Sequence, residues 1–316
     1  MSLALLFPGQ GSQQPGMLHT LPASPAVTAT LAEARDILSD MGVRGDLDTV
    51  AALHDTAYVQ IALVIAGVAC ARALIEDHEL APAFVAGHSV GAFSAAVTAG
   101  VLTMREALVA VRLRGDLMRE ACAGRDWGMA AVSGLPTKTA QLLADETATA
   151  EDPLWVANVN SATQTVLSGS QVALGAAERA ANRLGARSFE HLEVSVASHC
   201  PLQSDTAERL TEHLAEVPRR TPTARYLTNA GGRSVGTAER ILNDLANAVA
   251  HPVRWYDATR LMAELGATVA VQTPPGRVLA QLLGSAVPTM TVVAVSEVGL
   301  ASAGAAERLK DAPGTG

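Results

Sequence analysis

Residues 84–99 have the sequence FVAGHSVGAFSAAVTA and carry the clearest local pattern in this chain. Phe84 to Ala86 is a short apolar run typical of a buried strand, and Val90 to Ala99 has the small residues and spacing of a helix. Between them, Gly87-His88-Ser89-Val90-Gly91 fits the pattern G-x-S-x-G, in which a sharp strand-to-helix turn carries a nucleophilic serine. The stretch therefore predicts a nucleophile elbow at Ser89 inside an α/β fold.

The residue types in this stretch suit such an elbow for physical reasons. A turn this tight favours glycine on both sides, at Gly87 and Gly91, and it lifts the Ser89 hydroxyl out of the end of the strand. Small residues after it let the helix pack closely, and unpaired N–H groups at the helix N-terminus place a positive dipole beside the nucleophile. A glycine-rich turn without a catalytic role also fits these five residues, so both interpretations stay open at this point.

Strand-like and helix-like runs alternate on both sides of this stretch. Leu3 to Phe7 predicts a buried strand, Tyr58 to Leu74 a buried helix, and Met104 to about Cys122 a further helix. Later in the chain, a helix is expected near Leu202–Ala215, and strands near Tyr226–Thr228, Thr268–Val271 and Thr289–Val295. This alternation favours an α/β fold with a mostly parallel sheet, and the small polar residues from Ala301 onward predict a frayed tail.

The middle of the chain has a different rhythm, β-α-β-β-α-β, which is the ferredoxin-like motif. Its expected elements, four strands and two helices, are Met129–Val132, Thr137–Asp145, Trp155–Val159, Thr165–Leu167, Ala173–Leu184 and Ser188–Leu192. We therefore expect a large α/β domain formed by residues 1–126 and 195–316, with an inserted ferredoxin-like small subdomain at residues 127–194.

Composition excludes several broad classes of protein. The chain has 316 residues, 49% of them hydrophobic, which is too apolar for a disordered protein. A net charge of −8 argues against a nucleic-acid or anionic-membrane partner, and three scattered cysteines without CxxC spacing argue against a disulfide scaffold. Ile61 to Ala71 is apolar but too short to cross a bilayer. Phe84 to Met104 is rich in glycine, serine and threonine, so it is not expected to be a membrane span either. These features predict a soluble, cytoplasmic protein.

A serine nucleophile needs a base, and the chain has eight histidines. His88 lies inside the elbow, where a side chain next to the serine normally points away from it. His199 follows a predicted strand and precedes a predicted helix, so it is expected on a loop at a sheet end, within reach of the elbow. No aspartate is obviously placed to orient His199, which leaves a backbone carbonyl for that role. A surface loop histidine is the alternative.

The predicted helix that begins at Met104 places an arginine on its apolar face. Apolar or small residues form one stripe at helical spacing, whereas charged residues such as Arg112 and Asp116 form the opposite face. Arg114 falls on the apolar stripe, where a guanidinium cannot lose its proton and is costly to bury without a partner. Arg114 either forms a structural ion pair, extends its charge to solvent, or awaits the carboxylate of an anionic substrate.

The loop FPGQGSQ, from Phe7 to Gln13, ends the first predicted strand. Its glycines allow the backbone to approach a ligand closely, and its freed N–H groups can form an oxyanion site. The chain lacks the dinucleotide-binding and P-loop patterns, so no nucleotide cofactor is expected, and no histidine or acidic cluster predicts a metal. Cys200, next to His199, is more typical of packing than of a nucleophile.

Together, four motifs in this order closely resemble the malonyl-CoA:acyl-carrier-protein transacylases: FPGQGSQ from Phe7, GHSVG from Gly87, LRG from Leu113 and SHC from Ser198. The resemblance covers about Leu3 to Val295 and includes NVNS from Asn158 and HPVRW from His251. It implies an α/β-hydrolase-like large domain and a ferredoxin-like small one, in agreement with the order of the predicted elements.

By position, the resemblance implies that Ser89 is acylated, that His199 is its base and that Arg114 binds the free carboxylate of the malonyl group. It also implies an oxyanion hole formed by the backbone N–H groups of Gln10 and Val90. The implied reaction moves a malonyl group from malonyl-CoA to the phosphopantetheine-type thiol of an acyl carrier protein. It proceeds in two acyl-transfer steps through the serine, without a cofactor or a metal.

The chain departs from the family pattern in ways that imply a finer placement. Ala92 stands where an acidic residue is common, and Ala248 stands where glutamine usually supplies the carbonyl that orients the histidine. With QQPGML from Gln13 and PPGRVL from Pro274, the chain looks most like the malonyl-transferase (epsilon) subunit of bacterial malonate decarboxylase. That placement implies a carrier with a phosphoribosyl-dephospho-CoA type group and other malonate decarboxylase subunits as partners. A malonyl transacylase of fatty-acid or polyketide synthesis is the alternative.

Two other classes of protein use part of the same motifs. A serine esterase or thioesterase would need the same serine and histidine, but an arginine on an apolar face and the lack of a clearly placed triad acid argue against it. A non-catalytic subunit would keep the fold and only bind a carrier protein. Because carrier proteins are usually acidic, a local basic patch is also expected, with the candidates Arg119, Arg125, Arg183 and Arg187.

Overall fold

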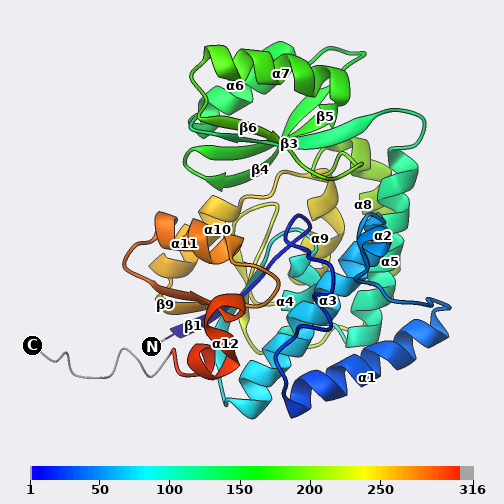
Figure 1. Cartoon of the computed structure of the whole chain (residues 1–316), viewed down its shortest axis with the longest axis vertical. Helices are drawn as coiled ribbons and strands as arrows, with labels where there is room; N and C mark the ends of the chain where they lie inside the picture. The colour runs from blue at the N-terminus through cyan, green and yellow to red at the C-terminus, as the bar shows by residue number, and fades with distance from the viewer. Residues whose placement is uncertain (1, 307–316) are drawn as a thin grey trace, which may run out of the picture.

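Two β-sheets, one mainly parallel and one antiparallel, form the framework of the protein in a computed structural model that describes residues 2–306 (Figure 1). The large sheet has six strands in the order β10-β9-β1-β2-β7-β8, and only β8 runs antiparallel to its neighbour. These strands are β1 (Ser2–Phe7), β2 (Pro82–Gly87), β7 (Arg225–Leu227), β8 (Ser234–Val235), β9 (Ala267–Gln272) and β10 (Thr291–Ala294). The predicted α/β class is confirmed.

Strands β1 and β2 lie at the centre of the large sheet, with helices over both faces (Figure 1). Leu3 to Phe7 are all at most 1% exposed, which explains why β1 is a continuous apolar run rather than an alternating one. The helices of this part of the chain are α1 (Pro25–Asp40), α2 (Val50–Leu53), α3 (Thr56–Arg72), α4 (Gly91–Thr98), α5 (Met104–Ala121), α8 (Ser204–Ala215), α9 (Ala238–Asn247), α10 (Trp255–Glu264), α11 (Val278–Ala286) and α12 (Val295–Gly304). Short turns of other helix types follow α3 (Ala73–Asp77) and precede α8 and α10 (Pro201–Gln203 and Ala248–Ala250).

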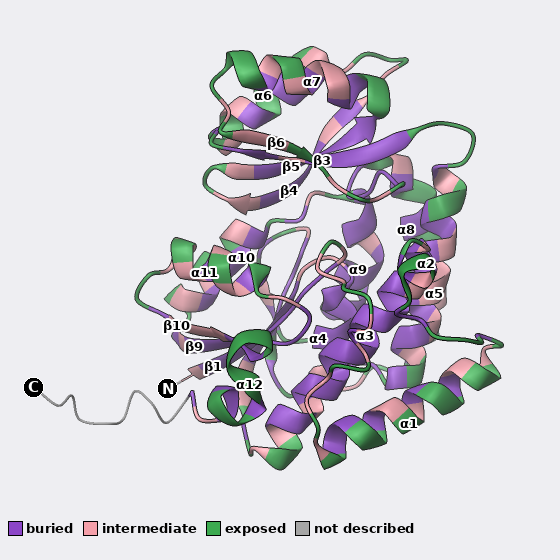
Figure 2. Ribbon diagram, viewed as in Figure 1, coloured by how far each residue is buried: buried purple, intermediate pink, exposed green. Residues whose placement is uncertain are grey.

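Helix α3 is the core helix of the large domain. With its last π-helical turn it spans Thr56–Asp77, and by length and composition it is apolar enough to cross a membrane. The expectation that the apolar run here is too short for that was therefore wrong, because the helix extends beyond Ile61 to Ala71 at both ends. However, 83% of the apolar window is buried inside the protein. Figure 2 shows α3 mostly in the colour of buried residues, so the apolar surface of α3 is used for packing.

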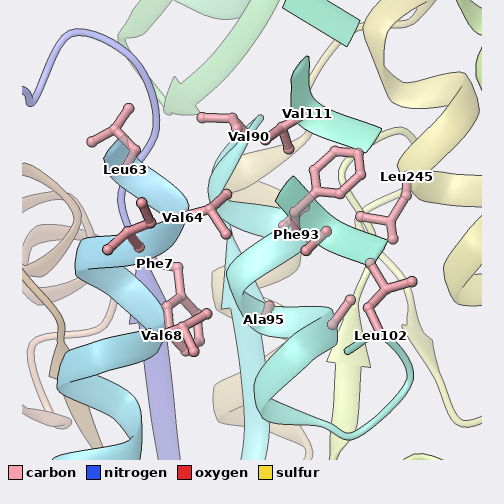
Figure 3. Close-up of a cluster of buried hydrophobic side chains, with 14 of the residues drawn as sticks. Phe7, Leu63, Val64, Val68, Val90, Phe93, Ala95, Leu102, Val111 and Leu245 are labelled. Atoms are coloured by element: carbon pink, nitrogen blue, oxygen red, sulfur yellow. The ribbon is translucent and has the colours of Figure 1, made fainter. Parts of the chain in front are cut away.

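The Gly87–Gly91 turn packs on a tight apolar cluster around α4 (Figure 3). Phe7 from β1, Val64 from α3, Val111 from α5 and Leu245 from α9 all contribute to this cluster, and Phe93 projects from α4 into it. A side-chain carbon added at Gly67 of α3 would lie 2.8 Å from Ser94 Oγ, so α3 and α4 approach each other closely. The small residues after the elbow therefore permit this packing, as predicted.

The second sheet confirms the ferredoxin-like order. Its four strands pair in the order β4-β5-β3-β6, all antiparallel, and two helices cover one of its faces (Figure 1). The elements are β3 (Trp127–Ser133), α6 (Thr137–Thr147), β4 (Leu154–Ser161), β5 (Gln164–Ser170), α7 (Gln171–Arg183) and β6 (Ser188–His191). We propose residues 127–194 as the limits of the small subdomain, since all six elements lie within them.

The end of the described chain differs from the prediction. The last strand stops at Ala294, and α12 starts at Val295 and continues to Gly304, so the segment from Ala301 to Gly304 is helical rather than frayed. Leu300, Ala303 and Ala306 belong to the main apolar core. The small size of Ala303 and Ala306 concealed their packing role in the sequence, because alanine is as common in tails as in close contacts. The rest of the predicted tail, residues 307–316, lies outside the described residues.

Candidate active site

The predicted nucleophile elbow is present between β2 and α4. Strand β2 ends at Gly87, α4 begins at Gly91, and Ser89 has a φ of 52°, in the left-handed region that non-glycine residues rarely adopt. A side-chain carbon on Gly87 would lie 2.1 Å from the carbonyl carbon of Gly91, and one on Gly91 would lie 2.2 Å from the carbonyl oxygen of Phe7. Space alone therefore requires both glycines, and the turn presents Ser89 beyond the end of β2.

His199 lies next to Ser89, although 110 residues separate them in the sequence. The Ser89 Oγ to His199 Nε2 distance is 2.7 Å, and His199 is only 2% exposed. Its Nδ1 lies 2.6 Å from the Ala248 carbonyl oxygen, and its main-chain N–H donates to the Val249 carbonyl oxygen at 2.7 Å. A carbonyl can only accept, so Nδ1 carries the proton and Nε2 is left to accept one from Ser89. The expectation that a backbone carbonyl orients His199 is confirmed.

Burial and charge keep the imidazole of His199 neutral. The pKa of His199 falls from 6.5 to about 3, chiefly because burial disfavours the charged ring, and secondly because the Arg114 guanidinium repels a positive charge there. The contact with the Ala248 carbonyl opposes this shift only in part. At neutral pH the His199 ring is therefore free to take the Ser89 proton.

Arg114 is buried on the packed face of α5 and points at Ser89. It is 3% exposed; its Nη2 donates to Ser89 Oγ at 3.1 Å, and its Nη1 donates to Gln60 Oε1 at 2.6 Å. Burial lowers the pKa of Arg114 to about 10, so the group stays charged at neutral pH. Within residues 2–306 no carboxylate forms an ion pair with Arg114. Among the described residues Arg114 therefore has no structural ion pair, and its side chain does not reach solvent, so both of these alternatives are wrong. The site holds a buried cation with no anion from residues 2–306.

Gln60 is a site residue that the sequence analysis missed. It lies in α3, is 0% exposed, and uses its two amide atoms to bind Arg114 and to contact Met118 Sδ at 3.4 Å. Gly115 brings the two helices together, since a side-chain carbon there would lie 2.4 Å from Ala57 Cα of α3. A lone glutamine within the apolar run of α3 was the available signal, because a buried amide needs hydrogen-bond partners.

The loop with Gln10 packs directly on the elbow. A side-chain carbon on Gly9 would lie 2.4 Å from the His88 carbonyl oxygen, so the loop that follows β1 touches the turn that follows β2. Val90 is fully buried and occupies the N-cap position of α4, without a side-chain capping hydrogen bond. Across the described part of the chain, the main-chain N–H groups of Gln10 and Val90 donate to no protein acceptor. Both are available for a developing oxyanion.

The neighbouring His88 is turned away from Ser89, as expected. Its Nε2 lies 3.1 Å from Asn160 Oδ1 of β4, and its ring packs edge-on against Trp255 at a centroid distance of 5.5 Å. On the other side of the site, Ser198 Oγ contacts Met129 Sδ of β3 at 3.3 Å. Ser89 and His199 therefore lie between the two sheets, with the small antiparallel sheet next to them.

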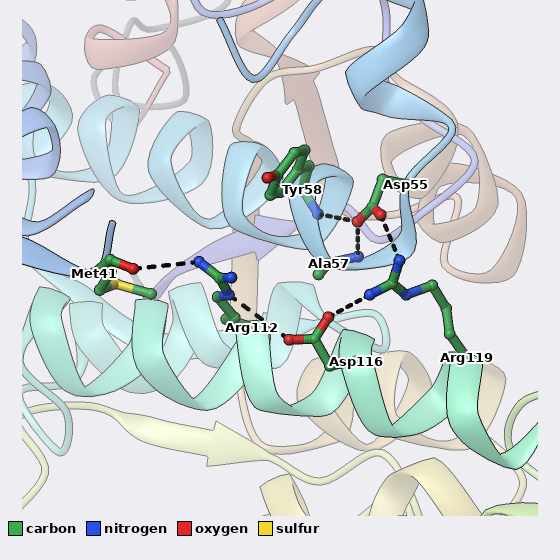
Figure 4. A network of polar contacts seen from close by, with 7 residues as sticks. All are labelled: Met41, Asp55, Ala57, Tyr58, Arg112, Asp116 and Arg119. Atoms are coloured by element: carbon green, nitrogen blue, oxygen red, sulfur yellow. Dashed lines mark hydrogen bonds and ion pairs between the residues drawn. The ribbon is translucent and has the colours of Figure 1, made fainter. Parts of the chain in front are cut away.

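The opposite face of α5 is occupied by ion pairs (Figure 4). Arg119 binds both Asp55, which caps the N-terminus of α3, and Asp116, and Asp116 also pairs with Arg112. Arg125 is likewise paired, with Asp152. Two of the four arginines expected in a basic patch are therefore already neutralised.

Other chemistries find no support among residues 2–306. No group of three or more histidine, cysteine, aspartate or glutamate side chains there could hold a metal ion. Cys70, Cys122 and Cys200 are all buried and unpaired. Burial raises the pKa of Cys200 to about 12, so its thiol stays protonated and is a poor nucleophile.

Comparison with known proteins gives one consistent result. Residues 4–304 match the family described as the acyl transferase domain. The malonyl CoA-acyl carrier protein transacylase of Escherichia coli strain K12 is 35% identical over 296 residues, which cover 93% of this chain and 96% of the relative. The crystal structure of an acyl-carrier-protein S-malonyltransferase from Burkholderia pseudomallei superposes with a TM-score of 0.88 at 32% identity, covering 96% and 99% of the two chains. A malonyl-transacylase in complex with its type II polyketide synthase acyl-carrier protein also has a TM-score of 0.88, at 34% identity and covering 96% and 99%.

Proposed function

The chain belongs to the acyl transferase family and is an acyltransferase, and from that premise we propose that it transfers a malonyl group from malonyl-CoA to the thiol of an acyl carrier protein, with Ser89 as the nucleophile. One observation carries this proposal. Ser89 Oγ lies within hydrogen-bond distance of both a neutral base, His199, and a buried guanidinium, Arg114, that has no carboxylate partner among residues 2–306. The neutral base His199 serves any acyl transfer, whereas the guanidinium of Arg114 can bind an acyl group that ends in a carboxylate.

In the first half-reaction, Ser89 Oγ attacks the thioester carbonyl while His199 Nε2 takes its proton. The carbonyl oxygen becomes an oxyanion that accepts hydrogen bonds from the N–H groups of Gln10 and Val90. When the carbon–sulfur bond breaks, His199 returns the proton to the sulfur and CoA leaves as a thiol. Arg114 moves from Ser89 Oγ to the malonyl carboxylate, with Gln60 holding its other nitrogen.

In the second half-reaction, the carrier thiol repeats these steps on the Ser89 ester. His199 removes the thiol proton, the sulfur attacks the ester carbonyl, and the proton passes to Ser89 Oγ as the ester breaks. A hydrolase would admit water at this stage. The buried Arg114 favours the transferase over a general esterase, because an esterase for neutral acyl groups has no use for an unpaired cation beside its nucleophile.

Intact-protein mass spectrometry tests this function. Mixing the protein with malonyl-CoA should add the mass of one malonyl group, located on Ser89 by peptide mapping, and acetyl-CoA should react much less. Adding a thiol acceptor should discharge the adduct faster than water does. Faster discharge to water would favour the hydrolase, and a protein that takes no adduct would be a binding subunit.

Acidification from pH 7.5 to about 5 should leave kcat/KM for malonyl-CoA nearly unchanged. The pKa of His199 lies near 3, so its ring stays deprotonated over this range, and the active form is lost only as the pH falls toward that value. The profile of kcat/KM against pH reports the free enzyme and measures this directly. Arg114→Ala removes a positive charge near the ring and should move the acid limb to higher pH. A tenfold loss per pH unit beginning near 6.5 in the unaltered enzyme would contradict the prediction.

Within this function, we propose malonate decarboxylase as the setting and the cytoplasm as the location. The motifs QQPGML from Gln13 and PPGRVL from Pro274 support this placement over fatty-acid or polyketide synthesis. Transfer rates should then be higher to a carrier with a phosphoribosyl-dephospho-CoA type group than to one with phosphopantetheine. The reverse preference would assign the enzyme to fatty-acid or polyketide synthesis and leave the chemistry at Ser89 unchanged.

A further inference from the structure

The buried side-chain amide of Asn229 forms hydrogen bonds with the backbone of the nucleophile elbow. Asn229, 3% exposed, follows β7, the strand next to β2 in the large sheet. Its Oδ1 accepts the main-chain N–H of Ser89 at 2.8 Å, and its Nδ2 donates to the carbonyl oxygen of Gly87 at 3.0 Å. One partner can only donate and the other can only accept, so the orientation of the amide is fixed. Asn229 thus ties together the two residues on either side of His88.

The backbone at this point needs such a restraint. A φ of 52° at Ser89 is unfavourable for a residue with a side chain, and it persists only where the surroundings impose it. Rotation at Ser89 would move its Oγ away from His199 Nε2 and would also redirect the N–H of Val90. Because Asn229 already occupies the N–H of Ser89, that N–H does not face the oxyanion, and Val90 supplies the elbow's donor.

Asn229 is itself held by a buried carboxylate. Asp244, 5% exposed on α9, accepts the main-chain N–H of Asn229 at 2.9 Å, that of Ala230 at 3.1 Å and the Tyr226 hydroxyl at 3.0 Å. Within residues 2–306 no lysine, arginine or histidine forms an ion pair with Asp244. All three donors come from the strand end that carries Asn229, so the carboxylate serves to fix that segment.

We propose that Asn229 is a positioning residue for the reaction, which holds the Gly87–Ser89 backbone in the conformation that aims Ser89 Oγ at His199 and the Val90 N–H at the oxyanion. Asp244 anchors Asn229 in this role. The inference rests on the proposed function only in taking Ser89 as the nucleophile. It assigns a role in the reaction to the hydrogen bonds of Asn229 and Asp244. Neither residue belongs to the G-x-S-x-G motif or to the proposed catalytic residues.

Substitution at Asn229 tests this role with two readouts. Asn229→Ala should slow the formation of the malonyl adduct on the order of a hundredfold, since small misplacement of reacting groups has that effect, with KM for malonyl-CoA changed less than about threefold. It should slow labelling of Ser89 by a fluorophosphonate probe to a similar extent. Asn243→Ala, on the exposed side of α9, is the matched control and should keep both rates.

Asn229→Asp separates positioning from a merely structural role. In this variant an ionised carboxylate accepts the N–H of Ser89 but repels the Gly87 carbonyl, whereas a protonated carboxyl group donates to that carbonyl and restores both hydrogen bonds. The rate of this variant should therefore rise as the pH falls from 7.5 to 5, against a flat profile for the unaltered enzyme. If Asn229→Ala does not fold, this pH rescue still decides the matter.

The possible failures are distinct. An unaltered enzyme that reacts with the phosphonate at Ser89 but takes no malonyl group would refute the proposed function and leave this inference testable by the probe. Variants at Asn229 that acylate and label at the unaltered rate, or an Asn229→Asp variant with a flat pH profile, would overturn the inference alone.

Discussion

Replacing Ser89 with alanine should abolish the acyl-enzyme and lower malonyl transfer by a factor on the order of 10⁶, the size of loss that follows removal of a serine nucleophile in hydrolases. His199 and Arg114 both contact Ser89 Oγ, so the substitution removes the atom on which the site converges. The main-chain N–H groups of Gln10 and Val90 and the Arg114 guanidinium remain, so malonyl-CoA should still bind. Intact-mass measurement of the adduct and steady-state transfer to a carrier thiol give the two readouts.

Ser94→Ala provides a matched control for this experiment. Ser94 lies five residues later in α4, is 1% exposed, and its hydroxyl has no hydrogen-bond partner among residues 2–306. Its removal takes away an unsatisfied buried polar group, so the variant should fold and transfer malonyl groups at the normal rate. A malonyl adduct that persists in Ser89→Ala at the same stoichiometry would place the nucleophile elsewhere in the chain.

The local features of the site were predictable because they depend on neighbours in the sequence. The elbow follows from the glycines at positions 87 and 91, whose space is limited by the turn itself and by β1. Arg114 was recognised because helical spacing alone places it on the buried face of α5. A backbone carbonyl was expected for want of a suitable acid, the family resemblance pointed to Ala248, and the structure places the Ala248 carbonyl oxygen 2.6 Å from His199 Nδ1.

The supporting residues were not predictable because their partners are distant in the sequence. Gln60 reaches Arg114 only because α3 packs against α5. Asn229 is 140 residues from Ser89 in the sequence and reaches it only because β7 pairs with β2. Helix α9 was missed as well, although Thr237 caps it and its apolar residues face the core. With only ten residues between two loops, α9 has too short an apolar pattern to stand out from the longer apolar runs of the chain.

Replacing Arg114 with alanine should change the choice of acyl group rather than simply stop the reaction. A malonyl carboxylate bound next to Ser89 would lose its buried counter-charge, a loss of about 3–5 kcal/mol. That corresponds to a fall in kcat/KM for malonyl-CoA of roughly a hundredfold to a few thousandfold. Acetyl-CoA carries no carboxylate, so its transfer should stay the same or rise. The ratio of kcat/KM for the two thioesters measures this selectivity.

Two further variants separate charge, geometry and folding. Arg114→Lys keeps the charge but not the planar pair of donors that binds Gln60 and a carboxylate together, so its malonyl preference should fall between those of the alanine variant and the unaltered enzyme. Arg112→Ala removes a guanidinium from the opposite, half-exposed face of the same helix and should leave the preference unchanged. Equal losses of malonyl and acetyl transfer in Arg114→Ala would mean that Arg114 supports the fold of the site. A selective loss would mean that the buried cation is kept, despite its cost in burial, because the substrate supplies the anion.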